Sequence, residues 1–284
     1  MAKKNDFVLT DSNYYSADAN KRFCSVSQLK SFIGTPASIG CEYKAMEELN
    51  GRYIRPETDA LLVGSYVDTA LLEPEKMESF KELHPEMIST RGKTAGQVKA
   101  EFVVADRMIE KVKNDKKCMA LLDGEHQTVM TGEIFGLPFK IKMDNYRPGK
   151  FIADLKTCED IYKSYYAKGY GTMSFIEYFD YILQGAIYQE IVRQNTGKKL
   201  PFYIVAVSKQ KDEPDLQAIW IDNESLKRKL FGDELAPGLS DEITRVRMIK
   251  NGEIEPCRCG KCLLCRQTKV VDKIIDWREL LGEV

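Results

Sequence analysis

The chain has 284 residues, 43% of them hydrophobic and 30% charged, with a formal net charge of −1. This is the composition of a globular protein, and the length suits one large domain or a domain with appendages. The net charge excludes a globally basic protein, so any surface for nucleic acid must be local. No stretch approaches the roughly 18–20 apolar residues of a membrane span. No apolar core follows the basic N-terminus, so we expect no signal peptide and a cytoplasmic protein with reduced cysteines.

Residues 1–20 are polar, and we expect them to be extended or poorly ordered. Ser25 then caps a helix that ends before Gly34. Further helices are predicted over 60–73, 94–113, 174–194 and 223–250, and strands over 127–135, 139–146, 151–157, 202–208 and 216–221. Helices that precede and follow the strands predict a mixed α/β core in which helices pack on both faces of the sheet.

The strands over 139–146 and 151–157 form the most informative feature of the chain. Their apolar residues alternate, so Asp144 falls on the polar side of the first strand, and Asp154 and Lys156 on that of the second. A three-residue loop, Pro148-Gly149-Lys150, places Asp144 directly opposite Asp154, whereas a two- or four-residue loop separates them. Two facing carboxylates can hold a hard divalent cation, and a lysine beside them can act on a scissile group. We expect metal-dependent cleavage of a charged ester, such as a phosphodiester.

The helix over 174–194 supplies a second element of this site. Tyr181, Gln184 and Tyr188 share one stripe of the helix, next to an apolar stripe. The stripe is compatible with polar residues that merely fringe the core. In the functional interpretation, Gln184 and Tyr188 lie at the metal site or against a DNA backbone.

Four cysteines gather within nine residues of the C-terminal tail: Cys257, Cys259, Cys262 and Cys265. In a reducing compartment this density indicates a metal site rather than disulfides. The four could form a local zinc knuckle, or a distant cysteine could replace one of them.

Taken in order, these residues resemble the PD-(D/E)xK nuclease superfamily, and specifically the RecE/RecB-type exonucleases of phages and prophages. Gly64-Ser-Tyr-Val-Asp68 matches the first motif, Met143-Asp144 the second, Asp154-Leu155-Lys156 the third and Gln184-Gly-Ala-Ile-Tyr188 the fourth. The resemblance implies a restriction-endonuclease-like core over 25–250, a polar extension over 1–24 and a cysteine-rich tail over 251–284 that packs back on the core.

The same resemblance implies a Mg²⁺- or Mn²⁺-dependent exonuclease that acts on DNA ends in phage or prophage recombination. Asp68, Asp144 and Asp154 would bind the metal, Lys156 would act in catalysis, and Gln184 and Tyr188 would support the site. The family's first motif usually carries a histidine where this chain has Asp68. An aspartate keeps an all-oxygen shell that suits magnesium, but the change also leaves open a weak or silent DNA-binding protein with the nuclease fold.

In some RecB-type nucleases, one cysteine before the core and three after it hold a [4Fe–4S] cluster. By this resemblance Cys41 joins Cys259, Cys262 and Cys265, with structural Zn²⁺ as the alternative metal and Cys257 as the alternative fourth ligand. The expected partner is DNA, and the resemblance leaves room for a single-strand annealing protein and for self-association. Basic residues that could contact DNA are Lys140, Lys142, Lys209, Arg258, Lys261, Arg266 and Lys269.

Overall fold

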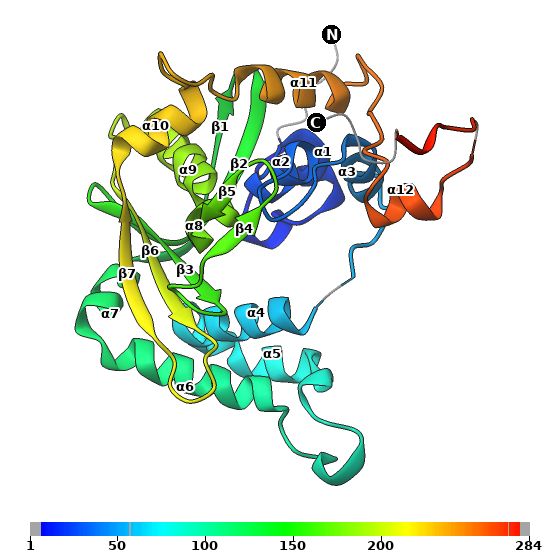
Figure 1. Cartoon of the computed structure of the whole chain (residues 1–284). Helices are drawn as coiled ribbons and strands as arrows, with labels where there is room; N and C mark the ends of the chain where they lie inside the picture. Colours follow the sequence, from blue (N-terminus) through cyan, green and yellow to red (C-terminus); the bar gives the residue numbers. More distant parts are fainter. Residues whose placement is uncertain (1–6, 57, 272, 279–284) are drawn as a thin grey trace.

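The computed structural model describes residues 7–56, 58–271 and 273–278, and a five-stranded mixed sheet lies at its centre (Figure 1). The strands occur in the spatial order β1-β2-β3-β6-β7, and only β3 and β6 are parallel neighbours. Their bounds are Glu125–Ile134 (β1), Leu137–Arg147 (β2), Phe151–Cys158 (β3), Phe202–Ser208 (β6) and Leu216–Ile221 (β7). The predicted mixed α/β class is confirmed.

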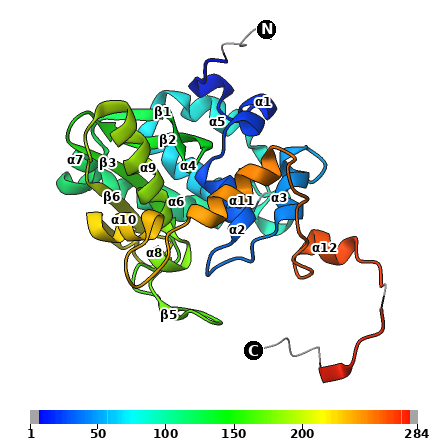
Figure 2. The same cartoon turned by 90° about the horizontal axis from the view of Figure 1, so that it is seen from above.

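Helices cover both faces of this sheet, and each face has its own hydrophobic core (Figures 1 and 2). One core is formed with α4 (Asp59–Leu72), α6 (Ala100–Asn114) and α7 (Lys116–Leu122). The other is formed with α2 (Val26–Ile33), α9 (Tyr181–Thr196), α10 (Asn223–Phe231) and α11 (Ser240–Lys250). Along β3, Leu155 enters the first core and Ile152 the second, as strand alternation requires.

Shorter elements connect these layers. The helices are α1 (Ala17–Arg22), α3 (Glu42–Leu49), α5 (Met77–Leu83), α8 (Phe175–Tyr178) and α12 (Leu263–Gln267), and a separate two-stranded hairpin consists of β4 (Tyr165–Ala167) and β5 (Gly171–Met173). Single 3₁₀ turns occur at Asp11–Asn13, Pro74–Lys76, Pro85–Met87 and Gly92–Thr94. Within the described ranges, no helix combines the length and the apolar character needed to cross a bilayer.

The N-terminal segment departs from the sequence prediction. Its first six residues lie outside the described part of the chain, but residues 11–22 fold into a 3₁₀ turn and α1 rather than being extended or poorly ordered. This segment contacts Lys140, which is 1% exposed and must find acceptors inside the protein. Its ammonium donates to the carbonyl of Tyr14 and, at 2.7 Å, to Oδ1 of Asn20. The segment therefore belongs to the folded body.

Two predicted helices also differ in extent. The helix expected from residue 94 begins only at Ala100, because Val98 forms a β-bridge with Ile88. The helix expected over 174–194 is two helices. Ser174 caps α8, and Asp180, in the left-handed conformation with φ 53°, caps α9 by accepting the N–H of Leu183. The break sets the direction of α9 independently of α8.

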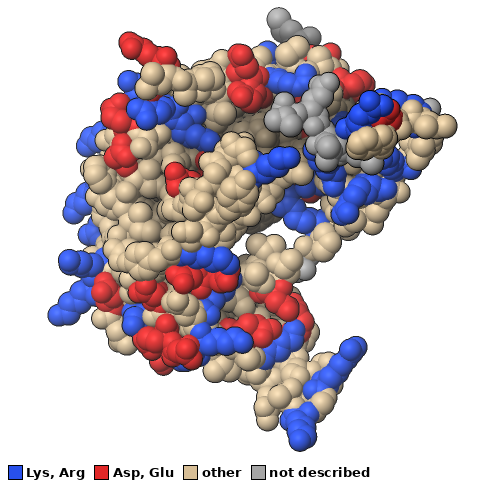
Figure 3. All heavy atoms as spheres, in the orientation of Figure 1, with Lys and Arg blue, Asp and Glu red and all other residues tan. Residues whose placement is uncertain are grey.

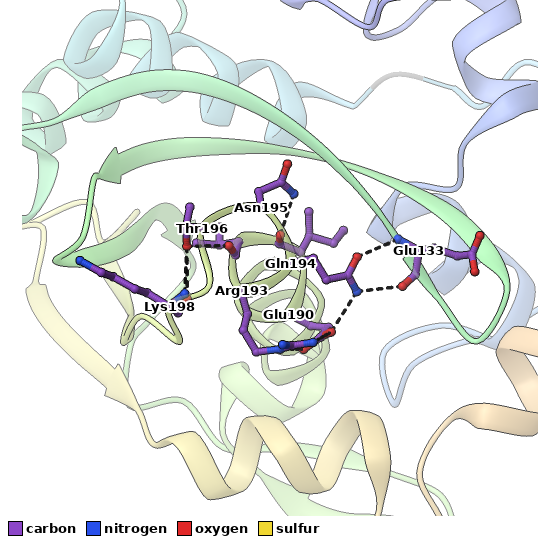
Figure 4. Close-up of polar contacts among 9 residues, drawn as sticks. Glu133, Glu190, Arg193, Gln194, Asn195, Thr196 and Lys198 are labelled. Carbon is purple, nitrogen blue, oxygen red and sulfur yellow. Dashed lines mark hydrogen bonds and ion pairs between the residues drawn. The ribbon is translucent and has the colours of Figure 1, made fainter.

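The C-terminal end of α9 is attached to the edge of the sheet (Figure 4). The side-chain amide of Gln194 accepts the N–H of Glu133 at 3.0 Å and donates to the carbonyl of the same residue at 2.8 Å. Asn195 donates to the carbonyl of Thr131 at 2.9 Å. These bonds satisfy backbone groups of β1 on its free edge and fix the far end of α9. The opposite half of α9 carries Gln184 and Tyr188.

Candidate active site

The hairpin of β2 and β3 has the register that the three-residue loop predicts. Pairing begins at Arg147 with Phe151 and ends at Asn145 with Ala153. Continued by one residue, this register sets Asp144 opposite Asp154, but the ladder stops there. The carboxylate of Asp144 instead accepts the backbone N–H of Leu155 at 2.9 Å. The two strands therefore separate at Asp144 and Asp154. The side-chain hydrogen bond of Asp144 takes the place of a backbone hydrogen bond between the strands.

Asp154 is the central group of the site, and it is 1% exposed. Its Oδ1 accepts a hydrogen bond of 2.6 Å from Nε2 of Gln184 on α9. Its Oδ2 forms an ion pair with the ammonium of Lys156 and has no other partner among the described residues. A buried carboxylate held on both sides is a functional-site signal rather than a solvated surface pair.

The six predicted site residues, Asp68, Asp144, Asp154, Lys156, Gln184 and Tyr188, all line one cavity of about 460 Å³. Asp68 comes from α4, so the cavity joins the helix on one side of the sheet to α9 on the other. Tyr188 lies on the same helix as Gln184, and its hydroxyl donates to the carbonyl of Lys142 at 2.8 Å. Tyr188 therefore braces α9 against β2.

The carboxyl groups repel one another in this cavity. Burial raises the pKa of Asp68 to about 7, although the nearby Lys156 lowers it. Burial and then the charge of Asp154 raise the pKa of Asp144 well above its ordinary value. For Lys156, burial acts to lower the pKa, but Asp154 and Asp144 outweigh it and raise the value above the ordinary range. One lysine thus faces three acidic groups, and it stays protonated.

These donors fit a divalent metal ion. The raised pKa values of Asp68 and Asp144 mean that their charged forms are poorly compensated in this cavity, which a bound cation would correct. Oxygen donors are those that magnesium and manganese prefer. The aspartates are not as tightly gathered as the cysteines described next. Among the described residues, only those cysteines form a group of three or more His, Cys, Asp or Glu side chains close enough to hold an ion as they stand. An ion at the aspartates therefore requires side-chain adjustments.

The cysteine group joins Cys41, at the N-cap of α3, to three residues of the tail: Cys259, Cys262 and Cys265. Their sulfur atoms lie within 4.8 Å of one another, and Sγ of Cys41 is 3.6 Å from Sγ of Cys265. Cys257 is exposed and outside the group, and its sulfur accepts from Arg245 at 3.3 Å. Burial opposes ionisation of Cys259, but the N–H groups of Cys262 and Lys261 lower its pKa to about 7. The group could hold a metal.

Of the predicted DNA contacts, three lysines already have partners. Lys140 is buried and donates hydrogen bonds to the N-terminal segment, so the prediction that it contacts DNA is wrong. Lys142 pairs with Asp11 at 2.7 Å, and Lys209 donates to the carbonyl of Ala60 at 3.2 Å. The tail residues Arg258, Lys261, Arg266 and Lys269 are exposed. Figure 3 shows Lys and Arg side chains gathered over the region of α12 and the tail.

One wall of the cavity is formed by residues that the sequence motifs do not include. Tyr14 and Tyr15 line it from the N-terminal segment, and Ser27, Lys30 and Ser31 line it from α2. Burial lowers the pKa of Lys30 to about 8, and its ammonium donates to the carbonyl of Phe179 at 2.8 Å. Lys30 precedes the first motif by a long stretch, and its spacing on α2 gives no signal that it faces the cavity. When segments far apart in the sequence form one cavity, local spacing cannot identify every residue that lines it.

Comparison with known proteins places this geometry in a family. A crystal structure from Eubacterium rectale, described as a "Putative exonuclease", superposes with a TM-score of 0.88 at 40% sequence identity, covering 98% of this chain and 100% of that one. No curated protein matches the sequence. The family model of the PDDEXK-like domain of unknown function DUF3799 matches residues 25–268. The predicted PD-(D/E)xK fold is thereby confirmed, and the chain belongs to the PDDEXK-like DUF3799 family.

Proposed function

We propose that the protein is a Mg²⁺-dependent exodeoxyribonuclease that hydrolyses phosphodiester bonds at DNA ends. The observation that carries the proposal is the cavity in which Asp68, Asp144 and Asp154 converge on Lys156. The exonuclease description of the Eubacterium rectale relative supports the same activity. The RecE/RecB resemblance adds recombination in phages or prophages as the biological setting.

In this proposal the three aspartates hold magnesium or manganese, which when bound neutralises phosphoryl charge and activates water. Gln184 fixes the orientation of Asp154 by its hydrogen bond to Oδ1. Lys156 remains protonated beside the acids, which suits it to stabilise negative charge on the phosphoryl group rather than to remove a proton. Asp68 takes the place of the family's histidine and keeps the ligand set entirely oxygen.

We also propose that Cys41, Cys259, Cys262 and Cys265 hold a structural metal centre that fastens the tail to α3. A tetrahedral zinc ion with Zn–S bonds of about 2.3 Å separates its sulfur ligands by about 3.8 Å. Sγ of Cys41 and Sγ of Cys265 are 3.6 Å apart, and all four sulfur atoms lie within 4.8 Å of one another, which matches that size. A [4Fe–4S] cluster, which the RecB resemblance implies, is larger and would hold the sulfurs farther apart. The spacing therefore favours zinc, and elemental analysis with a visible absorption spectrum decides between the two.

The activity is tested with end-labelled single- and double-stranded linear DNA, with magnesium and with EDTA. We expect nucleotides to be released from the ends only when magnesium is present. A closed circular duplex is the matched substrate without ends and should survive. A protein that binds DNA but cleaves neither linear form would instead be the silent DNA-binding protein with a nuclease fold.

A further inference from the structure

A small hairpin stands next to the site and takes no part in the chemistry described so far. It comprises residues 161–173, here named the arm, and is joined through Glu159 and Asp160 to the end of β3, which carries Asp154 and Lys156. Its strands pair only with each other, through Tyr165–Met173, Tyr166–Thr172 and Ala167–Gly171. Figure 2 shows it projecting from the body at β5. A projecting hairpin of this size contributes little to the core.

The composition of the arm is unusual for a surface loop. It contains four tyrosines, two lysines and no acidic residue. Three of the tyrosine side chains lie in solvent, with exposed fractions of 74% for Tyr162, 72% for Tyr166 and 68% for Tyr170. No aliphatic side chain of the arm is exposed. Large exposed rings that stabilise nothing in the fold indicate a surface that binds something flat or apolar.

The fourth tyrosine connects the arm to the active site. The ring of Tyr165 stacks on Tyr178 with centroids 4.5 Å apart and meets the ring of Phe179 at 5.7 Å. Phe179 in turn lies 5.9 Å from Tyr181, whose ring is 5.1 Å from the ammonium of Lys156. A continuous series of rings thus extends from Lys156 to the base of the arm. A chain bound along the arm would lie adjacent to the site.

The charged residues of the arm indicate what kind of polymer it could bind. Lys168 is exposed and has no hydrogen bond or ion pair with any described residue. Lys163 pairs with Glu159 at 2.6 Å, but both side chains are exposed, so the pair is weak and can exchange for a phosphate. Exposed rings for base stacking beside lysines for phosphates are the features of surfaces that bind single-stranded nucleic acid. Bases within a duplex are already stacked and cannot cover these rings.

We propose that the arm binds single-stranded DNA beside the cavity, with bases stacked on Tyr166 and Tyr170 and a phosphate on Lys168. The proposal rests on the proposed nuclease function for its substrate. It adds that the enzyme engages an unpaired strand next to the cleaved end. Binding and cleavage are separate measurements, so failure of one can be told from failure of the other.

The test is fluorescence anisotropy with a labelled oligothymidylate in EDTA, where cleavage is absent. The double variant Tyr166→Ala/Tyr170→Ala should bind about 30-fold or more weakly, since it loses two stacked bases that each contribute about 1 kcal/mol or more. Tyr166→Phe/Tyr170→Phe should retain binding, because the ring is kept. Trp220→Ala is the matched control, since this side chain is 60% exposed on β7, away from the arm.

Three results would overturn the proposal: wild-type affinity in the alanine double variant, an equal loss in the phenylalanine variant, or an equal loss of affinity for a blunt duplex. Loss of self-association in the alanine variant with unchanged oligothymidylate affinity would likewise assign the arm to a protein contact. If wild-type protein cleaves no DNA but shows arm-dependent binding of oligothymidylate, the nuclease proposal fails and the binding proposal stands.

Discussion

The amide of Gln184 donates to Oδ1 of Asp154 over 2.6 Å, while the ammonium of Lys156 pairs with Oδ2 of the same carboxylate. Asp154 is therefore held in one orientation by α9 and by its own strand. This relationship couples the packing of α9 to the geometry of the proposed metal site. The hydrogen bonds of Gln194 and Asn195 to β1 hold the other end of the same helix.

We predict that Gln184→Leu lowers the turnover of DNA cleavage by about 10–100-fold, because Asp154 loses the partner that orients it. Steady-state kinetics with labelled linear DNA measures the change. Gln189→Leu is the control on the same helix, since Gln189 is also buried but binds the carbonyl of Leu200 and Asn223. It should lower the free energy of unfolding by about 1–3 kcal/mol and leave turnover of the folded protein intact. Equal turnover in wild type and Gln184→Leu would refute the positioning role.

The proposed metal site predicts that serine substitutions of Cys41 and Cys257 have different effects on metal content and melting temperature. Cys41→Ser should abolish the bound metal and lower the melting temperature, because the tail then loses its attachment to α3. Cys257→Ser should keep both, since Cys257 lies outside the sulfur group. Elemental analysis of purified protein and a thermal melt give the two readouts. Metal retained in Cys41→Ser and lost in Cys257→Ser would show that the site is local to the tail.

Lys30 predicts a pH dependence of stability. Burial lowers its pKa in the folded protein to about 8, whereas an unfolded lysine keeps the ordinary value of about 10.5. Between these values the unfolded chain binds more protons, so the penalty of burying the charge is complete below pH 8 and is relieved as the pH rises. Relative to Lys30→Met, the wild type should gain about 1–2 kcal/mol of unfolding free energy between pH 7 and pH 10. Urea titrations across this range measure it, and a constant difference between the two proteins would contradict it.

Two glycines of the motifs should respond differently to alanine. A Cβ at Gly185 would lie 2.6 Å from Cδ1 of Phe202 and 2.9 Å from Leu226, inside the core. Gly185→Ala should therefore cost about 1–3 kcal/mol of stability through overpacking. At Gly64 the nearest atom is Oγ1 of Thr157 at 3.6 Å, an ordinary contact, so Gly64→Ala should be neutral or gain up to about 1 kcal/mol. Chemical denaturation of both variants decides, and a larger loss at Gly64 would contradict this packing.

Local periodicity was enough to predict the sheet. The strands β6 and β7 lie at the predicted residues, and the register of β2 and β3 follows from a loop of three residues. The convergence of Asp68 with Asp144 and Asp154 could be expected only from the resemblance, because no spacing rule relates α4 to the hairpin. The placement of Cys41 beside the tail was likewise expected from the resemblance alone.

What the sequence could not predict depends on long-range contacts. The N-terminal segment is polar and looks extended, yet Lys140, about 120 residues away, needs its carbonyls. The break at Asp180 was missed because the apolar stripe continues across it, although an aspartate that can cap a helix stands there. The arm has no periodic pattern, so nothing in the sequence separates its three exposed tyrosines from tyrosines that pack in a core.

We propose that Lys156 and the three aspartates form a magnesium-dependent site for cleaving DNA ends. The most direct measurement is release of nucleotides from end-labelled linear DNA by wild type and by Lys156→Ala, each with magnesium and with EDTA. The structure predicts cleavage by wild type with magnesium only, and none by a Lys156→Ala protein whose circular dichroism spectrum remains that of the folded chain. Equal cleavage in EDTA, or by folded Lys156→Ala, would contradict the proposed site.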